Sequence, residues 1–582
     1  MLIMHRSPRI SGHAMRILAI VLACLAIAGL LIFFTPRAAA AQSAAVSDSA
    51  STPSAQSGAR SVVILLLKGE DTLVVERIQR NARLVTATIA GPASPRISLQ
   101  YALGADHLIP TTAFTVGQVN AAADAPPLQS GSLTLTADSA FLSITGGGTT
   151  RDIRVATRPG ALPIVNNDFV AIEQAVRRAR AQGVTDLTVP LFALSAAQTV
   201  DANLVLVGSD SARLSLMNNI TTVAIDSAGN VTGGEVAAQG IRIVVLEGDS
   251  AAAVGIAKPD YSPPDDATYT AEEVTVRTPA GHVLAGTLTL PAAAGSRPEA
   301  SGAARAASVP RASQAARHPA VVTITGSGMQ DRDEFIPVAG GFRLFRQVAD
   351  TLTRRGIAVL RLDDRGIGGS GGDVNGTSAD FADDIRAAVA YLRNRDDIDP
   401  NRIALVGHSE GGMIAPMVAA TDSAIAAVAL FAGTAYTGRA IIDFQLDNAV
   451  RNNPAVPATS KDSIVAAMRA GFDTTAARTP WMRYFLAYDP LPTARRVRQP
   501  VLILQGATDQ QVRPEEARML EKALREAGNR DVTLRMFENR NHLFLHDSVG
   551  HPSGYATLPS GKVDAEVLGV LADWLAQHLG SR

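Results

Sequence analysis

The sequence predicts an α/β protein: a doubly wound, mostly parallel sheet with a helical cap, preceded by a smaller β-rich domain. Three observations support this prediction. Between residues 320 and 537, short apolar runs alternate with helical patterns, as they do in βαβ units. Those runs are continuously apolar, which is typical of strands covered on both faces. Upstream of residue 257, short strand-like runs follow one another with little helix between them, which is typical of a β-rich domain.

In the β-rich domain, the turn residues that separate the apolar runs delimit the expected strands. These strands are 62–67, 72–75, 84–89, 97–103, 133–144, 203–207, 221–225 and 241–246. One helical stretch is expected at 168–181. No catalytic pattern stands out in this domain, so we interpret it as a scaffold, substrate-presenting or partner-binding domain whose partner is unknown.

In the second half of the chain, a hairpin-like region at 274–290 precedes the expected parallel strands. These strands are 320–325, 357–362, 403–406, 427–431, 501–504 and 533–537. Between the second and third strands, Thr377 and Asp380 form a capping pair for a helix. Apolar side chains recur there at helical spacing, at Phe381, Ile385, Val389 and Leu392.

Composition excludes several classes of protein. The chain has 582 residues, enough for two to four domains, and 47% of them are hydrophobic, which excludes wholesale disorder. Lys and Arg number 53 against 54 Asp and Glu, so we expect no nucleic-acid partner. The single cysteine, Cys24, lies in the N-terminal apolar run. Disulfides, thiolate zinc sites and cysteine nucleophiles are therefore excluded from the folded part.

The N-terminus has the features of a secretory signal peptide over 1–41. Three arginines precede the apolar run 17–34, and the expected cleavage site follows Ala41. The run has 18 residues, which is long for a signal peptide and close to a membrane span, so an uncleaved membrane anchor is the alternative. In both cases the arginines place the rest of the chain outside, periplasmic or secreted, with membrane contact only through that segment.

Composition also marks the boundaries between segments. After the N-terminal segment, the expected order is a disordered linker at 42–60, the β-rich domain at 61–256, a proline-rich connector at 257–270 and the α/β domain at 271–582. The Ala-, Ser-, Arg- and Pro-rich stretch 292–317 is expected to be a long surface loop. At about 437–490 the α/β alternation breaks, which predicts the cap.

The strongest chemical signal is a G-x-S-x-G motif centred on Ser409, directly after an expected strand and before helix-forming residues. Small residues on both sides of the serine allow a strained strand-to-helix turn that exposes the hydroxyl. The N-terminus of the following helix adds backbone N–H groups where an oxyanion would form. Ser409 is therefore the candidate nucleophile.

A serine hydroxyl needs a base, and the base needs a carboxylate to orient it. Asp509 directly follows the strand 501–504, and His542 follows the strand 533–537. Serine, acid and histidine in this order, each after a strand, fit a triad at the carboxyl edge of the sheet. The candidate triad is Ser409, Asp509 and His542.

The candidate oxyanion donors are the backbone N–H groups of Gly328, Met329 and Glu410. The glycine-rich loop at 326–329 follows the first parallel strand and lets the backbone approach a substrate closely. A plain tight turn is the alternative interpretation of this loop. Glu410 directly follows the candidate nucleophile.

Other acids near these motifs have structural interpretations. Asp383 and Asp384 fit the exposed start of a helix. Asp363 and Asp364 end a strand, and Arg365 beside them predicts a structural ion pair.

His408 is interpreted as a turn residue rather than a base. His542 and His546 have an H-x₃-H spacing that can hold zinc on a helix, but no glutamate like that of H-E-x-x-H lies between them. The glycine-rich stretch 365–372 lacks the G-K-[ST] ending of a phosphate loop. We expect no metal and no organic cofactor.

Aromatic residues cluster within the expected cap. Trp481, Tyr484 and Phe485 fit an amphipathic helix that lines an apolar substrate pocket. In the alternative, they pack the core of the cap and do not touch the substrate.

Together these motifs resemble the α/β-hydrolase superfamily and, within it, the bacterial EstD-type carboxylesterases. The matching blocks are Gly326-Ser327-Gly328 with Gln330-Asp331-Arg332-Asp333, Asp364-Arg365-Gly366-x-Gly368-x-Ser370, Gly407-His408-Ser409-Glu410-Gly411-Gly412 and Asn541-His542-Leu543-Phe544. The resemblance covers about 270–582. The chain also looks like the serine aminopeptidase-type (S33-like) hydrolases. The 292–317 insertion departs from the pattern.

The resemblance implies a serine hydrolase with Ser409 as nucleophile, Asp509 as acid and His542 as base. It implies that Asp331 and Arg332 shape the oxyanion loop. The implied activity is cleavage of a small-molecule, small-acyl carboxylic ester through an acyl-enzyme. A serine peptidase or amidase is the alternative, and a non-catalytic envelope binding protein is a remote third.

Overall fold

The computed structural model describes residues 60–580, with gaps at 70, 92–93, 118–126, 147–148, 166–167, 196, 217–218, 256–258, 293–316, 375, 453–455 and 477–478. The expected signal peptide or anchor, nearly all of the linker and most of the 292–317 loop lie outside the described residues. The chain divides into two compact units between Pro259 and Asp260. No helix in the described ranges is long and apolar enough to span a membrane.

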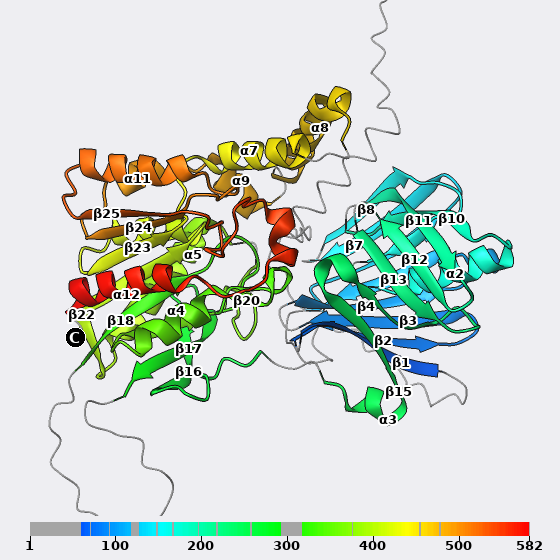
Figure 1. Ribbon diagram of the computed structural model, residues 1–582, viewed down its shortest axis with the longest axis horizontal. Helices are drawn as coiled ribbons and strands as arrows, with labels where there is room; N and C mark the ends of the chain where they lie inside the picture. Colours follow the sequence, from blue (N-terminus) through cyan, green and yellow to red (C-terminus); the bar gives the residue numbers. More distant parts are fainter. Residues whose placement is uncertain are drawn as a thin grey trace, which may run out of the picture. The chain divides into compact units, whose positions relative to one another are not determined.

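The N-terminal unit is built on one 15-stranded sheet (Figure 1). Its strands are β1 (Arg60–Lys68), β2 (Asp71–Arg80), β3 (Leu84–Gly91), β4 (Ser94–Ala102), β5 (Thr111–Val116), β6 (Gln129–Leu135), β7 (Ser139–Gly146), β8 (Thr149–Ala156), β9 (Leu162–Ile164), β10 (Asp186–Ala193), β11 (Gln198–Val207), β12 (Ser211–Leu216), β13 (Asn219–Ile225), β14 (Val231–Val236) and β15 (Ile241–Glu247). The spatial order runs from β8 back to β1, then from β15 back to β9. All neighbours are antiparallel except β9 and β10. The β-rich architecture expected for this half of the chain is therefore present.

The sheet curls around helix α2 (Val170–Ala181), which lies within the expected helical stretch 168–181. Buried side chains of α2 share one hydrophobic core with strands from both halves of the sheet, including β1 to β4 and β10 to β15. Open sheets of more than about ten strands usually curl or split, and here the apolar face of α2 is buried against strands from both halves of the sheet. A short helix, α3 (Gly248–Ala253), packs against β1 and β15.

One strand prediction in this unit is wrong. The run 133–144 is not a single strand, because the chain reverses at residues 136–139 and forms the hairpin β6–β7. The backbone N–H of Ser139 donates to Thr136 Oγ1 at 3.1 Å, which closes the turn. Apolar residues continue on both sides of this turn, so hydrophobicity alone does not reveal it.

The C-terminal unit contains an eight-stranded sheet in the order β16-β17-β21-β18-β22-β23-β24-β25. These strands are β16 (Tyr269–Arg277), β17 (Val283–Pro291), β21 (Ala358–Leu362), β18 (His318–Ile324), β22 (Ile398–His408), β23 (Ala427–Phe431), β24 (Val501–Gly506) and β25 (Val532–Phe537). The hairpin β16–β17 joins the sheet in an antiparallel sense, and the strands from β21 onward are parallel. Each of the six predicted parallel strands corresponds to one of these, and the predicted hairpin is β16–β17.

Helices cover this sheet. They are α4 (Leu344–Thr353), α5 (Ser378–Arg393), α6 (Gly411–Ala419), α11 (Pro514–Glu526) and α12 (Ala565–Leu579). Figure 1 shows α4 and α12 beside each other, and their apolar side chains form one core with alternate residues of the strands. The expected capping pair is confirmed, since Thr377 and Asp380 bond reciprocally at the start of α5. A small hairpin, β19 (Phe335–Ile336) with β20 (Phe342–Arg343), precedes α4.

Within the described residues, four α-helices lie between β23 and β24, where the sequence shows a break in the α/β alternation. They are α7 (Gly438–Arg451), α8 (Lys461–Ala476), α9 (Pro480–Ala487) and α10 (Pro490–Ala494). Helices α7, α8 and α9 contact one another. We refer to 437–490 as the helical insertion. Helix α9 packs closely on the start of α7, because a Cβ on Gly438 would lie 2.4 Å from the carbonyl oxygen of Phe485.

Candidate active site

Ser409 lies in a tight turn between strand β22 and helix α6. Its φ is +54°, in the left-handed region that residues other than glycine rarely adopt. The backbone N–H of Ser409 donates to the carbonyl of Phe431, at the end of β23, at 2.9 Å. This is the strained strand-to-helix turn that the G-x-S-x-G motif predicts.

The glycines around Ser409 are required by backbone packing. A Cβ on Gly407 would lie 2.1 Å from the carbonyl oxygen of Gly411, and a Cβ on Gly411 would lie 2.1 Å from that of Ile324. A Cβ on Gly412 would lie 2.7 Å from the Cα of Gly433. Side chains at these positions would push the turn away from the neighbouring strands, so the motif is explained sterically.

Asp509 and His542 form a buried pair. Asp509 lies in the turn after β24, His542 follows β25, and His542 Nδ1 lies 2.8 Å from Asp509 Oδ2. The same carboxylate oxygen accepts from Gln505 Nε2 at 3.0 Å, and the other accepts the backbone N–H groups of Gln511 and Val512. Because the carboxylate is an acceptor, Nδ1 carries the proton of neutral His542, and Nε2 is left as the basic nitrogen.

The loop that carries His542 is shaped by a buried asparagine. Asn541 Oδ1 accepts the backbone N–H groups of Leu543 and Leu545, at 2.9 and 3.1 Å. Its Nδ2 donates to Asp547 Oδ2 at 3.2 Å. These three bonds fix the backbone on both sides of His542.

His408 links the serine turn to the base. His408 Nε2 lies 3.1 Å from the carbonyl oxygen of His542, and the two ring centroids are 4.8 Å apart. Because Ser409 directly follows His408, the structure brings the three candidate triad residues to one edge of the sheet. The interpretation of His408 as a turn residue rather than a base does not include its side-chain contacts: the side chain is 2% exposed and bonds through both ring nitrogens.

The loop after β18 passes directly beside Ser409. A Cβ on Gly326 would lie 3.3 Å from Ser409 Cβ. The N–H of Gly326 donates to Glu334 Oε1 at 3.0 Å, and the N–H of Gln330 donates to Asp364 Oδ2 at 3.1 Å. Both ends of the loop are thus tied to buried carboxylates.

Two of the candidate oxyanion donors lie in this loop after β18, and the third lies beside Ser409. Gly328 and Met329 fall between the two tied positions, and Gly328 has a φ of +109°, which favours glycine. Glu410 is the N-cap residue that directly precedes helix α6. Backbone N–H groups at a helix N-terminus stabilise negative charge.

The acids at the end of β21 pair differently from the prediction. Asp363 bonds Arg332, with contacts of 2.9 and 3.0 Å, and Arg365 instead bonds Asp384 Oδ2 at 2.8 Å. The prediction that Asp384 is exposed is also wrong, since it is buried. Asp383 and Asp384 are adjacent on α5 but point in different directions. Asp384 points inward, toward Arg365, while Asp383 is exposed and pairs with Arg386.

Two further aspartates near the loop are buried. Asp331 Oδ1 accepts the N–H of Phe335 at 3.0 Å, and Oδ2 accepts from Tyr261 at 3.2 Å. Burial, together with the charge of Asp333, raises the pKa of Asp331 to about 6. Burial also raises the pKa of Asp364 well above its usual value.

The side chain of Glu410 contacts the helical insertion. Its Oε1 accepts from Ser378 Oγ at 2.6 Å and from Trp481 Nε1 at 2.9 Å. Burial raises the pKa of this carboxyl group. Trp481 stacks on Phe485 with ring centroids 5.4 Å apart, and Tyr484 stacks on Tyr488. Trp481, one of the three candidate pocket residues, is therefore bonded directly to the residue that follows Ser409.

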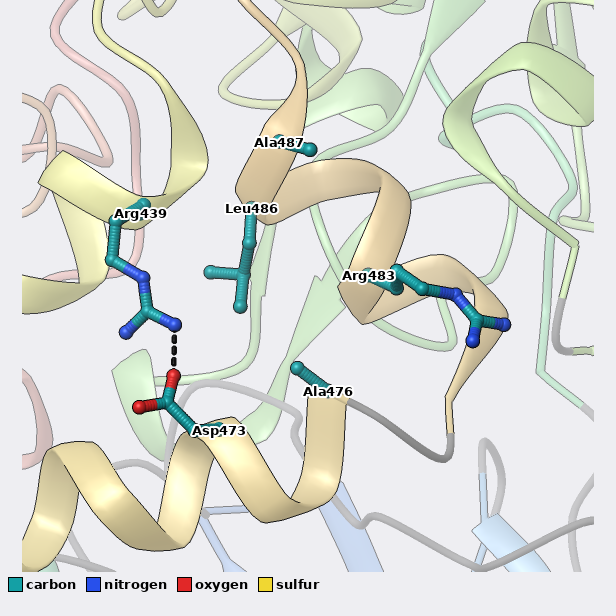
Figure 2. A pocket seen from close by; sticks show the side chains of 6 residues that line it. All are labelled: Arg439, Asp473, Ala476, Arg483, Leu486 and Ala487. Atoms are coloured by element: carbon teal, nitrogen blue, oxygen red, sulfur yellow. Dashed lines mark hydrogen bonds and ion pairs between the residues drawn. The ribbon is translucent and has the colours of Figure 1, made fainter.

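A groove of about 410 Å³ lies within the helical insertion (Figure 2). It is lined by Arg439, Asp473, Ala476, Arg483, Leu486 and Ala487. Figure 2 shows Arg439 of α7 pointing toward Asp473 of α8, with which it forms an ion pair. Trp481, Tyr484 and Phe485, which the sequence pattern predicts to line a pocket, do not line this groove.

Three contributors to the site were not predicted: Glu334, Gln505 and Ser378. Glu334 follows the Gln330–Asp333 block directly, but its contact with His408 bridges 74 positions in the sequence, and no spacing signal indicates it. Gln505 ends a buried strand, where a polar side chain is a usable signal. Within the described ranges, no group of three or more His, Cys, Asp and Glu side chains is arranged to hold a metal ion.

The C-terminal unit is similar to a known protein family. Residues 326–558 match the model of the Abhydrolase_6 family, described as the alpha/beta hydrolase family. The doubly wound sheet of the C-terminal unit agrees with that description. The expected resemblance to α/β hydrolases is thereby confirmed over residues 326–558.

Two curated relatives are similar to the same part. The esterase EstD of Thermotoga maritima is 27% identical over 266 residues, which is 44% of this chain and 62% of EstD. The uncharacterized peptidase YuxL of Bacillus subtilis is 27% identical over 243 residues, 39% of this chain and 31% of YuxL. The chain thus spans less than two thirds of either relative.

Solved structures are similar to about half of the chain. The esterase Pf2001 of Pyrococcus furiosus is 16% identical, covers 55% of this chain and 98% of its own, and has a TM-score of 0.37. The esterase domain of a Rhodothermus marinus protein is 19% identical, covers 53% of this chain and 100% of its own, and has a TM-score of 0.32.

Proposed function

We propose that this chain is an exported serine hydrolase, a carboxylesterase that cleaves small-acyl carboxylic esters. The observation that carries the proposal is the buried bond of 2.8 Å between His542 Nδ1 and Asp509 Oδ2, beside the left-handed turn of Ser409. Similarity to the esterase EstD supports the ester over other acyl compounds. The proposed chemistry uses side chains and backbone alone, without a metal or organic cofactor.

In the first half of the reaction, Ser409 Oγ attacks the ester carbonyl while His542 Nε2 takes the hydroxyl proton. Asp509 stabilises the resulting imidazolium and holds its orientation. The N–H groups of Gly328, Met329 and Glu410 stabilise the negative oxygen of the tetrahedral intermediate. When the intermediate collapses, His542 gives its proton to the leaving alcohol, and the acyl group remains on Ser409.

In the second half, a water molecule attacks the acyl-enzyme. His542 Nε2 takes a proton from the water, a second tetrahedral intermediate forms and collapses, and the carboxylic acid leaves as the proton returns to Ser409 Oγ. Each half uses the same base and the same oxyanion donors. One water molecule is consumed for each ester bond cleaved.

We propose that the helical insertion acts as the cap. The bond between Trp481 and Glu410 supports this, because it joins α9 to the residue that follows Ser409. In this proposal Trp481, Tyr484 and Phe485 line the acyl-binding pocket. An apolar aromatic wall at this place suits a short acyl chain.

The test is hydrolysis of a series of p-nitrophenyl esters, from acetate upward, by the wild-type chain and its Ser409→Ala variant. We expect turnover that disappears in the variant, and the dependence on chain length reports the depth of the pocket. Turnover that survives in Ser409→Ala would refute the serine mechanism. A fluorophosphonate probe that fails to label Ser409 would favour a non-catalytic envelope binding protein.

A serine peptidase or amidase is the second candidate, and similarity to the peptidase YuxL favours it. It uses the same groups, but His542 must give its proton to a leaving amine. Hydrolysis of p-nitroanilides at rates that match those of the p-nitrophenyl esters would support this candidate.

Export rests on the N-terminal segment 1–41. Fractionation of cells that express the full chain, with N-terminal sequencing of the product, tests it. A product that begins at Gln42 outside the cytoplasm supports cleavage, and an intact product in the membrane fraction supports an anchor.

A further inference from the structure

A buried pair of opposite charges lies beside Ser409. His408 Nδ1 is 2.6 Å from Glu334 Oε1, and His408 Nε2 is 3.1 Å from the carbonyl oxygen of His542. Both side chains are 2% exposed. A carboxylate and a carbonyl are both acceptors, so each ring nitrogen must donate a proton. Since neutral imidazole carries one ring proton, the two bonds together make His408 an imidazolium ion when Glu334 is ionised.

The same carboxylate oxygen also binds the oxyanion loop. Glu334 Oε1 accepts the N–H of Gly326 at 3.0 Å, and the backbone of Glu334 is in the left-handed region, with a φ of +54°. The N–H of Glu334 donates to the carbonyl of Asp331 at 2.9 Å, which ties the strained residue to its own turn. A strained backbone at a buried, charged residue indicates that its surroundings hold it in place.

We propose that Glu334 and His408 are positioning residues that lock the oxyanion loop and the loop of His542 onto the turn of Ser409. This inference rests on the proposed function. Three segments that are distant in sequence meet at the pair: the loop after β18 through Gly326, the serine turn through His408 itself, and the loop after β25 through the carbonyl of His542. His408 takes no part in proton transfer, because its Nε2 is bonded to the backbone of His542.

The geometry explains why a charged pair is kept in a buried place. Two buried charges are costly to desolvate, and an apolar pair of similar size is often as stable. An apolar pair would, however, leave the N–H of Gly326 and the carbonyl of His542 without these partners. The pair fixes the relative positions of oxyanion donors and base, and catalysis is sensitive to shifts of about 1 Å in such positions.

The decisive variant is Glu334→Gln, which keeps the shape of the side chain and removes its charge. His408 then becomes neutral and can donate only one of its two bonds. We expect kcat, and the rate at which a fluorophosphonate labels Ser409, to fall about 10- to 100-fold, with KM within about twofold. Glu334→Asp keeps the charge and should recover part of the labelling rate.

The same unit offers a matched control. His282 Nε2 lies 3.0 Å from Asp384 Oδ1 in another His–carboxylate pair, whose side chains are 12% and 6% exposed. Asp384→Asn removes the same kind of charge, and its side chain bonds His282 and Arg365, which lie outside the candidate triad. We expect the fluorophosphonate to label Ser409 of Asp384→Asn at the wild-type rate, and the variant to hydrolyse esters at the wild-type rate. Equal losses in Asp384→Asn and Glu334→Gln would overturn the proposal, as would a Glu334→Gln variant that labels at the wild-type rate.

A second readout does not depend on activity. Nitrogen-15 NMR of the histidine-labelled full chain, assigned with His408→Gln and His542→Gln, reports the ring protonation of both residues. We expect doubly protonated His408 in the wild type, and in Glu334→Gln a neutral His408 with shifted His542 signals. A neutral His408 in the wild type, or His542 signals unmoved in Glu334→Gln, would overturn the proposal. A wild-type chain that neither labels nor hydrolyses esters would refute the proposed function alone, and the NMR result would still decide the positioning role.

Discussion

The indole Nε1 of Trp481 donates a hydrogen bond of 2.9 Å to Glu410 Oε1. Helix α9 of the insertion is therefore attached to the residue that directly follows Ser409. The carboxylate at the other end of this bond is buried and also accepts from Ser378. A change in the insertion can thus reach the serine turn through a single side chain.

Replacing Trp481 with Phe tests this attachment. The variant keeps an aromatic ring that can stack on Phe485 but removes the donor, and a buried acceptor that loses a partner costs about 1–3 kcal/mol. We expect kcat/KM for p-nitrophenyl esters to fall about 3- to 10-fold, which corresponds to losing about half of that hydrogen-bond energy from the stabilisation of the transition state.

The chain provides a matched control, because it has two tryptophans. Trp574 lies on α12, and its Nε1 has no hydrogen-bond partner within the described structure. Trp574→Phe makes the same chemical change away from the site and should leave kcat/KM unchanged. If both variants lose activity equally, the bond to Glu410 has no special effect.

Asp509→Asn should lower kcat by about 10³- to 10⁴-fold. An asparagine amide would donate to His542 Nδ1, which moves the ring proton to Nε2 and removes the base. Steady-state ester hydrolysis measures the loss. The control is Asp531→Asn, because Asp531 contacts His578 at 3.3 Å in an exposed pair on the surface. A fall of less than tenfold in Asp509→Asn would point to another acid.

Gly411→Ala should abolish activity and destabilise the C-terminal unit by at least about 1–3 kcal/mol. The added Cβ would lie 2.1 Å from the carbonyl oxygen of Ile324, so strand and helix must separate. Gly569→Ala is the contrasting variant, since position 569 lies inside α12 with no atom within 4 Å of an added Cβ. It should stabilise the unit by about 0.5–1 kcal/mol.

Urea unfolding followed by tryptophan fluorescence measures both glycine variants. Trp481 and Trp574 both belong to the C-terminal unit, so this signal follows that unit alone. A Gly411→Ala protein as stable as the wild type would contradict the steric explanation of the motif.

The buried carboxyl of Asp331 predicts a pH dependence of stability. Burial raises its pKa to about 6 in the folded chain, above the value of about 3.9 expected when unfolded. Between these values the folded state binds more protons than the unfolded state, so this group stabilises the fold at low pH and its contribution is lost as the pH rises from about 4 to 6. Asp331→Asn should remove that slope.

The comparison requires the free energy of unfolding of the C-terminal unit at pH 4.5 and pH 7. Relative to the wild type, Asp331→Asn should gain about 2 kcal/mol between the lower and the higher pH. Asp383→Asn, on the exposed side of α5, serves as the control and should show no such gain. A parallel pH dependence in wild type and Asp331→Asn would exclude this carboxyl as the cause.

The sequence identifies the backbone of the site better than its side-chain partners. Continuous apolar runs mark the parallel strands, and Asp509 and His542 stand out because each directly follows one. The strained turn of Ser409 follows from its flanking glycines, since only these positions allow such close backbone contacts. The strands, the residues that follow them and the glycines around Ser409 are all visible in short stretches of sequence, and the structure has them at the predicted positions.

Which side chains pair with each other depends on the tertiary fold and cannot be predicted from the local sequence pattern. Asp363 lies two residues from Arg365 but bonds Arg332, because its side chain faces the loop after β18. His408 looks like a turn residue until β22 carries it into the core against Glu334. In the N-terminal unit, the hairpin β6–β7 escapes prediction because its turn is flanked by apolar residues on both sides.

The pairing of β1 with β15 has a consequence for how the N-terminal unit folds. Among the described strands, the other neighbours in this sheet are consecutive in the chain, so β1–β8 and β10–β15 are two antiparallel meanders that can form from local contacts, and β9 joins the second in parallel after α2. The seam between them, with Val62 opposite Glu247, requires closure of nearly the whole unit. Closure over such a distance is slow, because chain entropy is lost before the contacts form. The seam is therefore the late step of folding, and a chain shortened past β1 would leave two separate meanders with unpaired edges.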